Sequence, residues 1–295
     1  MKSRSTEDLA QLEQLLLHGG LAKFRAALAR LTVPELRSLS NLLIKRRSTQ
    51  AALSIAKQLQ ECPDIEARIL AAMLLGKVGA TSWARAKSGL ERLADDLEWP
   101  VREAAACGMK EALRENFPSV YPSISRWAVS KNARHRRAAA LAVMIGRSRD
   151  PGTVAKLLHV VELLLDDNDA YVRKSVGPFA LGYLGYTYPA AVLPRIKEWA
   201  FQKHNPRARW NLAMAFSQAL GRRFPGDALA VLSALLSQDD HPVVRAAAVA
   251  SLRNVAKVAP AAVSKAIQAA VWDGWLPPAV LARLGPNSPV RAALN

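Results

Sequence analysis

An arginine recurs along most of this chain at a nearly constant interval, and this repeat limits the folds that the chain can adopt. In each of six copies a short run of mostly small or apolar residues follows the arginine, and successive copies lie 34, 34, 37, 36 and 36 residues apart. The repeated residues are Arg68, Arg102, Arg136, Arg173, Arg209 and Arg245. A fixed period of this length predicts a solenoid, in which each repeat packs only on its neighbours.

The sequence between the arginines predicts helices. Apolar residues, mainly Ala and Leu, recur at i, i+3, i+4 and i+7, and no stretch alternates for long enough to predict a strand. Pro and Gly stand where helices would begin or end, as at 151–152 and 225–226. We therefore expect an all-α fold, a right-handed solenoid of antiparallel helix pairs with a concave basic groove. Residues 61–258 would form the repeat array, and residues 1–60 and 259–295 would form helical caps.

Acidic pairs precede several of the arginines, at Asp95-Asp96, Asp166-Asp167 and Asp239-Asp240. An acidic turn followed by an Arg at the next helix start resembles HEAT repeats, in which these side chains pair along the stack. A stacked or buried guanidinium needs a carboxylate partner. We therefore expect Arg102, Arg173 and Arg245 to hold neighbouring turns together rather than to bind a ligand.

The charge of the chain predicts a polyanionic partner. Lys and Arg number 41 against 24 Asp and Glu, which gives a net charge of +17. Basic residues also gather: six lie between Lys131 and Arg149, and seven between Arg195 and Arg223. Such runs neutralise phosphates and give salt-dependent, largely sequence-independent binding, so we expect a nucleic acid, DNA or RNA, as the partner.

Other classes of protein find little support in the sequence. The two cysteines, Cys62 and Cys107, are too few for a disulfide framework, and neither they nor the five His have the spacing of metal ligands. We expect no metal, no organic cofactor and a reducing compartment, the cytoplasm. The N-terminus has no apolar signal segment and no apolar run approaches about 18 residues, so we expect neither secretion nor membrane spanning.

The residue after each repeated arginine should face one common side of the array. When the six copies are aligned, these residues form one column: Ile69, Glu103, Arg137, Lys174, Trp210 and Ala246. A purely structural column would be uniformly apolar or small, whereas an acid, two bases and a Trp could line a groove. The alternative is that these residues are ordinary solvent-exposed polar positions with no role in binding.

The chain contains seven Trp residues, an unusually high number, and the sequence predicts a role for four of them. Trp127 and Trp199 end amphipathic helices and are predicted to be core. Trp99 and Trp210 stand at helix entrances beside the polar column, and are candidates for contacting bases or sugars.

The stretch from about Leu97 to Phe216 resembles the HEAT-like alkylpurine DNA glycosylases of bacterial DNA alkylation repair. The residues that carry the resemblance are Ile124-Ser-Arg-Trp-Ala-Val-Ser-Lys-Asn132, then Arg136-Arg-Ala-Ala-Ala140, then Tyr171-Val-Arg-Lys-Ser-Val-Gly177 and Tyr188-Pro189. The resemblance implies a fold of HEAT-like repeats, double-stranded alkylated or distorted DNA as the partner, and no cofactor.

The resemblance also implies roles for individual residues. The family has a catalytic Asp four residues after a Trp; in the repeat register Trp99 is that Trp and Glu103 takes the place of the Asp. An ungapped alignment back from Arg137 would instead place Arg102 there, one residue earlier. Arg137 falls where the family has its DNA-contacting Arg. Pro178, with Phe179 beside it, falls where the family has a second Trp. The expected DNA-binding residues are Trp99, Lys131, Arg134, Arg137, Lys174, Phe179, Arg207 and Trp210, with Glu103 as the catalytic acid.

Three functions agree with these observations. The first is excision of purines alkylated at N3 or N7, whose departure builds positive charge on the sugar that a carboxylate can stabilise. The second is a non-catalytic relative that recognises DNA shape or damage through the same groove. The third is a helical-repeat scaffold for an acidic protein partner.

Overall fold

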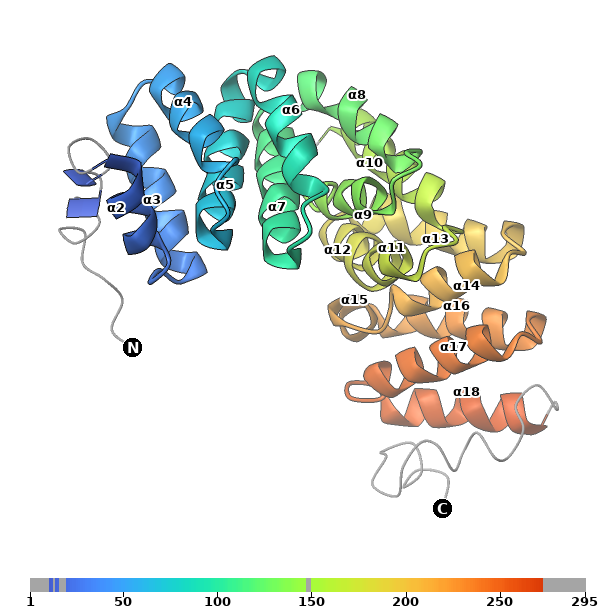
Figure 1. Cartoon of the computed structure of the whole chain (residues 1–295). Coiled ribbons are helices and arrows are strands. Elements are labelled where there is room, and N and C mark those ends of the chain that lie inside the picture. The colour runs from blue at the N-terminus through green and yellow to red at the C-terminus, as the bar shows by residue number, and fades with distance from the viewer. Residues whose placement is uncertain (1–10, 13, 16–19, 147–149, 273–295) are drawn as a thin grey trace. The chain divides into compact units, whose positions relative to one another are not determined.

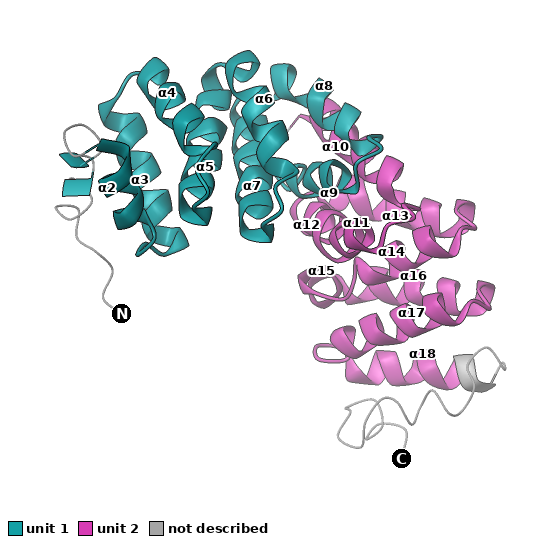
Figure 2. Ribbon diagram, viewed as in Figure 1, with its two compact units in different colours: residues 1–145 teal, residues 146–295 magenta. Residues whose placement is uncertain are grey.

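The computed structural model describes residues 11–12, 14–15, 20–146 and 150–272, and in these ranges the regular structure is entirely helical (Figure 1). The all-α prediction is therefore confirmed for this part of the chain. The chain divides into two compact units, residues 1–145 (unit 1) and 146–295 (unit 2), shown in separate colours in Figure 2. The predicted boundaries at residues 60 and 259 stay a prediction, and both outer ends of the predicted caps lie outside the described residues.

Unit 1 is built from consecutive helices that pack side by side. They are α2 (Gly20–Leu28), α3 (Val33–Arg46), α4 (Thr49–Leu59), α5 (Ile65–Thr81), α6 (Trp83–Ala94), α7 (Trp99–Glu115), α8 (Phe117–Ala128) and α9 (Ala133–Ala142). The tightest packing joins α5 and α7, because a Cβ added at Gly76 would lie 2.5 Å from the Cα of Gly108. The two helix backbones touch at this pair of glycines, where no side chain fits between them.

Unit 2 continues with helices α10 (Pro151–Leu164), α11 (Ala170–Ser175), α12 (Gly182–Thr187), α13 (Pro189–Gln202), α14 (Pro206–Met214), α15 (Ala219–Arg223), α16 (Pro225–Gln238), α17 (Pro242–Val255) and α18 (Pro260–Trp272). Here α14 packs on α17, and α16 packs on both α13 and α17. Most of these helices begin with Pro at the first position, where its missing N–H costs no hydrogen bond.

A π-helical segment, η1 (Val176–Leu181), separates α11 from α12. Pro178 within it has no N–H to donate, and the N–H of Gly177 donates to the side-chain oxygen of Asn211, 2.9 Å away. The amide nitrogen of Asn211 in turn donates to the carbonyl of Leu165 at 2.7 Å. The fully buried Asn211 of α14 thus satisfies backbone groups of two preceding segments and fixes the widened turn.

Gly177→Ala is expected to destabilise the protein by about 1–3 kcal/mol, the usual cost of overpacking a filled core. The new Cβ would lie 2.5 Å from the backbone oxygen of Asn211 and 2.8 Å from its Cα, so backbone must shift. Urea denaturation followed by circular dichroism measures the loss. Gly226→Ala is the matched control, since a Cβ there meets no atom within 4 Å and stability should be unchanged or slightly higher. Equal stability of the two variants would contradict this packing.

The repeated arginines serve the fold, as the sequence predicts, but several use partners other than the expected ones. In five of the six copies the guanidinium donates to backbone carbonyls of the turn that precedes its own helix. These contacts join Arg68 to Cys62 and Pro63, Arg102 to Asp96 and Leu97, Arg136 to Ser130 and Lys131, Arg173 to Asp167 and Asn168, and Arg245 to Asp239.

Two arginines reach the acidic turn of the next repeat. Nε of Arg68 lies 2.8 Å from a carboxylate oxygen of Asp96, and Nε of Arg209 lies 3.3 Å from one of Asp239. The prediction that Arg173 and Arg245 reach neighbouring turns is wrong, because the hydrogen bonds of both guanidinium groups go to the turn that precedes their own helix.

The remaining core follows the helical periodicity. Trp127 and Trp199 are buried, which confirms their prediction as core residues. The indole N–H of Trp199 donates to the carboxylate of Glu162 at 3.1 Å, and the ring of Trp127 stacks on His135.

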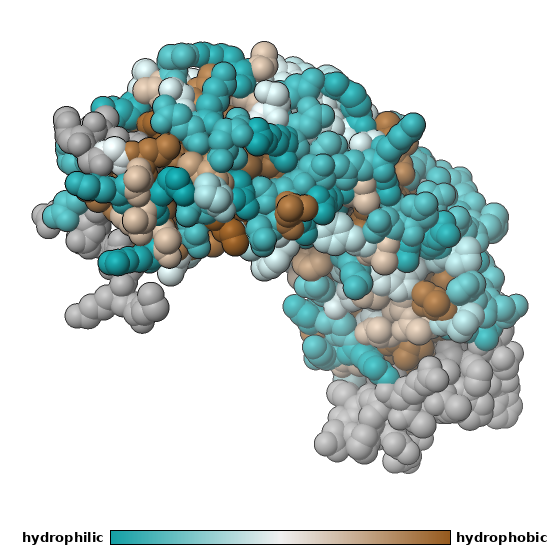
Figure 3. Space-filling view, viewed as in Figure 1, coloured by the Kyte–Doolittle hydropathy of each residue, from teal (hydrophilic) through white to brown (hydrophobic). Residues whose placement is uncertain are grey.

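Hydrophilic residues cover most of the face in Figure 3, with apolar spots between them. No described helix is both long and apolar enough to cross a membrane.

Candidate nucleic-acid interface

The sequence-predicted site residues divide between the two units. Unit 1 holds Trp99, Glu103, Lys131, Arg134 and Arg137, and unit 2 holds Lys174, Phe179, Arg207 and Trp210. Within each unit the structure brings some of them into one place. That a single concave face carries both sets stays a prediction.

In unit 1, the start of α7 presents an aromatic ring and a carboxylate together. Trp99 is the first residue of α7 and is 64% exposed, which is unusual for so large an apolar side chain. Glu103 lies four residues later, and residues at this spacing share one face of a helix. The preceding residue, Arg102, donates to the turn carbonyls and so does not compete for this face.

Glu103 is paired with the arginine of the next repeat. A carboxylate oxygen of Glu103 lies 2.8 Å from the guanidinium of Arg137 on α9, and their side chains are 38% and 17% exposed. The partial burial strengthens the interaction relative to an ion pair on open surface. The two residues that the sequence placed in neighbouring copies of one column are therefore in contact.

The start of α9 carries the other cations of unit 1. Arg134 donates to the carbonyl of Asp95 at 2.7 Å and to its carboxylate at 3.2 Å, so this guanidinium joins α9 to the turn before α7. Hydrogen bonds from Asn132, and to a smaller degree Arg134, lower the pKa of Asp95 below its ordinary value. Lys131 is exposed, and its ammonium group makes no hydrogen bond or ion pair with the described residues.

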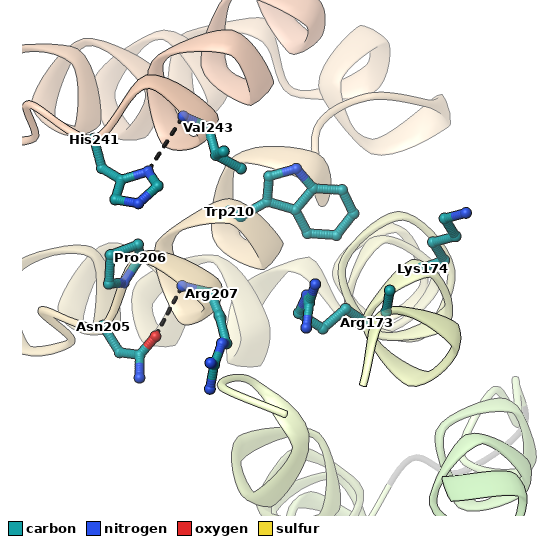
Figure 4. A pocket seen from close by; sticks show the side chains of 9 residues that line it. Arg173, Lys174, Asn205, Pro206, Arg207, Trp210, His241 and Val243 are labelled. Carbon is teal, nitrogen blue, oxygen red and sulfur yellow. Dashed lines mark hydrogen bonds between the residues drawn. The ribbon is translucent and has the colours of Figure 1, made fainter. Parts of the chain in front are cut away.

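In unit 2, the starts of α11, α14 and α17 surround a pocket of about 570 Å³ (Figure 4). Its lining residues are Ala170, Arg173, Lys174, Asn205, Pro206, Arg207, Trp210, His241 and Val243. Three of the predicted residues, Lys174, Arg207 and Trp210, therefore line one cavity. Phe179 of η1 is 46% exposed but does not contribute to the lining.

The pocket is strongly cationic. Arg173, Lys174 and Arg207 contribute positive charge, and none of the described lining residues is acidic. The side chains of Lys174 and Arg207 make no hydrogen bond or ion pair with other described residues, so both charges are available to a ligand. The first turns of α14 and α17 also lack the acidic residues that would offset the positive end of each helix dipole.

Of the six lining residues that sequence reasoning missed, three are polar or charged. Arg173 was assigned only to the fold, whereas Asn205 and His241 were not singled out. The signal was present, because Asn205 and His241 each precede a Pro at a helix start and accept a hydrogen bond from the backbone two residues on. The sequence does not show how the repeats pack, and it is this packing that brings the N-terminal caps of successive repeats around one cavity.

Comparison with known proteins places these features in context. The family model described as DNA alkylation repair enzyme matches residues 25–194, and a model of HEAT repeats matches residues 158–253. The second match confirms the predicted HEAT-like solenoid. No curated protein matches the chain.

Two crystal structures show the same fold. AlkD2 from Streptococcus mutans superposes with a TM-score of 0.56 at 20% identity, over 69% of this chain and 97% of AlkD2. The protein smu.31 from Streptococcus mutans UA159 has a TM-score of 0.55 at 21% identity, over 65% of this chain and 96% of its own. At such low identity these likenesses establish the fold alone.

Proposed function

Since the chain belongs to the DNA alkylation repair enzyme family, we propose that it binds double-stranded DNA and releases purines carrying a cationic alkyl adduct at N3 or N7. The observation that carries the proposal is that the exposed Trp99 and the partly exposed Glu103 carboxylate lie four residues apart on α7, a spacing that puts both on one face of the helix. An aromatic face beside a carboxylate favours a cation, and this reaction contains two: the alkylated base and the developing sugar cation.

The chemistry needs only a water molecule and these side chains. The bond between the sugar C1′ and the base nitrogen breaks, its electron pair neutralises the cationic base, and positive charge develops on the deoxyribose. The Glu103 carboxylate stabilises that charge and orients the water that adds to C1′, whose proton passes to solvent. No step calls for a metal or an organic cofactor.

Arg137 controls how much negative charge Glu103 offers. In the free protein the guanidinium neutralises the carboxylate across 2.8 Å. A DNA phosphate is a competing bidentate partner for an Arg, so a duplex bound over α9 would draw Arg137 away from Glu103. The negative field of the carboxylate would then act on the sugar without the offsetting guanidinium only when DNA is present.

A second function, damage recognition without excision, is favoured by the same ion pair. If Arg137 stays on Glu103 in the DNA complex, the guanidinium offsets the field of the carboxylate, which then stabilises a sugar cation much less. Pro178 and Phe179 also stand where the resembling glycosylases have a second Trp. Base release separates the two functions: a damage-binding protein retains affinity for alkylated duplexes and leaves the base attached.

Salt dependence tests the proposed DNA contacts. The logarithm of the association constant should fall linearly with the logarithm of salt concentration, with a slope near −0.9 for each neutralised phosphate. Lys131→Ala and Lys174→Ala should each reduce the magnitude of this slope by about 1, since neither ammonium group has a partner among the described residues. Fluorescence anisotropy with a labelled duplex measures it. Lys257→Ala removes an exposed cation in the turn after α17; it is the control and should leave the slope unchanged. Slopes identical in all three variants would contradict these contacts.

A further inference from the structure

We propose that the pocket of unit 2 binds an unpaired nucleotide of a DNA strand, with its base on Trp210 and the phosphates that flank it on Arg207 on one side and on Lys174 on the other. This inference rests on the proposed function, because it takes DNA as the partner. Beyond the proposed function, it assigns a second binding site, separate from Glu103, and states which structural form of DNA that site binds. The ligand is a nucleotide whose base has left the helical stack, at a strand end or at a distorted position.

The size and shape of the cavity suit such a ligand. Its volume of about 570 Å³ lies in the range of small-molecule sites, roughly 300–1,000 Å³. Figure 4 shows the Trp210 indole between Val243 and the Arg173 guanidinium, with His241 and Pro206 on the other side of the pocket. The indole is partly exposed and projects from α14, which holds it in place for stacking.

An aromatic ring beside free cations is the arrangement that binds unpaired nucleotides. Every base has a π-face, so stacking on Trp tolerates any sequence, and nearby cations neutralise the adjoining phosphates. A base within a duplex has both faces covered by its neighbours, and therefore cannot stack on Trp210 without leaving the helix. The pocket thus selects unpaired nucleotides over intact duplex.

The remaining polar atoms of the pocket are donors. Nδ1 of His241 accepts from the N–H of Val243 at 3.3 Å, which leaves Nε2 to carry the proton and face a ligand. The side-chain oxygen of Asn205 accepts from the N–H of Arg207 at 2.9 Å, which leaves its amide nitrogen to donate. Donors of this kind match phosphate oxygens and the carbonyl oxygens of bases.

The positive charge here is maintained against helix stability. Helix α14 spans nine residues and α17 fourteen, and neither has an acid in its first turn, where an acid would be stabilising. Arg207 instead adds a cation in the first turn of α14. An anionic ligand in the pocket would offset both this cation and the positive ends of the two helix dipoles.

Binding of matched DNA hairpins tests the proposal. One hairpin ends blunt and the other carries a short 3′ overhang, and fluorescence anisotropy gives both affinities. The wild type should prefer the overhang by about tenfold, the usual contribution of a base stacked on an aromatic side chain. Trp210→Ala should abolish this preference by weakening binding of the overhang hairpin more than binding of the blunt hairpin, while Trp210→Phe should keep most of the preference.

Phe201→Ala is the control, because Phe201 is 58% exposed on α13 and does not line the pocket. The proposal is overturned if the wild type shows no preference, or if Trp210→Ala weakens both hairpins equally while its circular dichroism spectrum stays native. It is also overturned if Phe201→Ala removes the preference as well. A free nucleoside monophosphate that displaces the overhang at comparable concentration would identify a free nucleotide as the ligand and likewise overturn the strand proposal.

Release of base from an alkylated duplex, measured with the same protein preparations, separates the two sites. Wild-type overhang preference without release of alkylated bases would overturn the proposed excision and support the pocket. Release that continues without any overhang preference would overturn the pocket alone.

Discussion

Glu103→Gln is expected to slow the release of 7-methylguanine and 3-methyladenine from duplex DNA by about 10²–10³-fold. The substitution keeps the size of the side chain and removes the charge that stabilises the sugar cation, and removal of one such electrostatic contact typically has this effect. Duplex affinity should be unchanged or higher, because the substitution replaces a charged partner of Arg137, 2.8 Å away, with a neutral one and so raises the net positive charge of this surface. Single-turnover release with excess protein isolates the chemical step from binding.

Two further variants give this experiment its controls. Glu98→Gln removes an exposed carboxylate just before α7, and should leave release unchanged. Glu103→Asp retains the charge on a shorter side chain and should keep most of the release that Gln loses. If Glu103→Gln releases base as fast as the wild type, Glu103 is not the catalytic acid.

Asn211→Leu should destabilise the protein by about 2–6 kcal/mol. Leu has a similar volume but no polar atoms, so the N–H of Gly177 and the carbonyl of Leu165 would be left buried without their present partners. Each such orphaned group costs about 1–3 kcal/mol. The substitution weakens the segment that joins α11 to α12. Urea denaturation followed by circular dichroism measures the decrease in the free energy of unfolding.

Asn168→Leu is the matched control for this effect. Asn168 is exposed in the turn before α11, and its side chain makes no hydrogen bond with the described residues, so stability should change by no more than about 0.5 kcal/mol. Equal effects at positions 168 and 211 would show that Asn211 does not bridge the two backbone segments.

The sequence was sufficient to predict the all-helical HEAT-like fold. The period of the arginines shows the size of the repeat, and the 3.6-residue periodicity of Ala and Leu predicts the helices and the burial of Trp127 and Trp199. The partners of Arg173 and Arg245 were mispredicted because acidic residues are visible in a sequence, whereas backbone carbonyls that converge in a turn are not. The π-helical segment η1 was also unforeseen, since it depends on the buried contact between Gly177 and Asn211.

The candidate sites were predicted in part. Spacing by one repeat placed Glu103 and Arg137 in one column, and their contact follows from the stacking of consecutive repeats. Nothing in the spacing distinguishes a solvated column from an ion pair, because that depends on how far apart α7 and α9 lie. In the same way, Asn205 and His241 are recognisable as helix caps in the sequence, but only the folded chain places them around Trp210.

The most direct test of the account is base release by the wild-type protein from a duplex that contains a single 7-methylguanine. The account predicts release well above spontaneous depurination, no release of unmodified guanine from the matched duplex, and loss of the activity in Glu103→Gln. Tight, salt-dependent binding to the alkylated duplex with no release above the spontaneous rate would contradict excision, and would leave recognition of damaged DNA as the function.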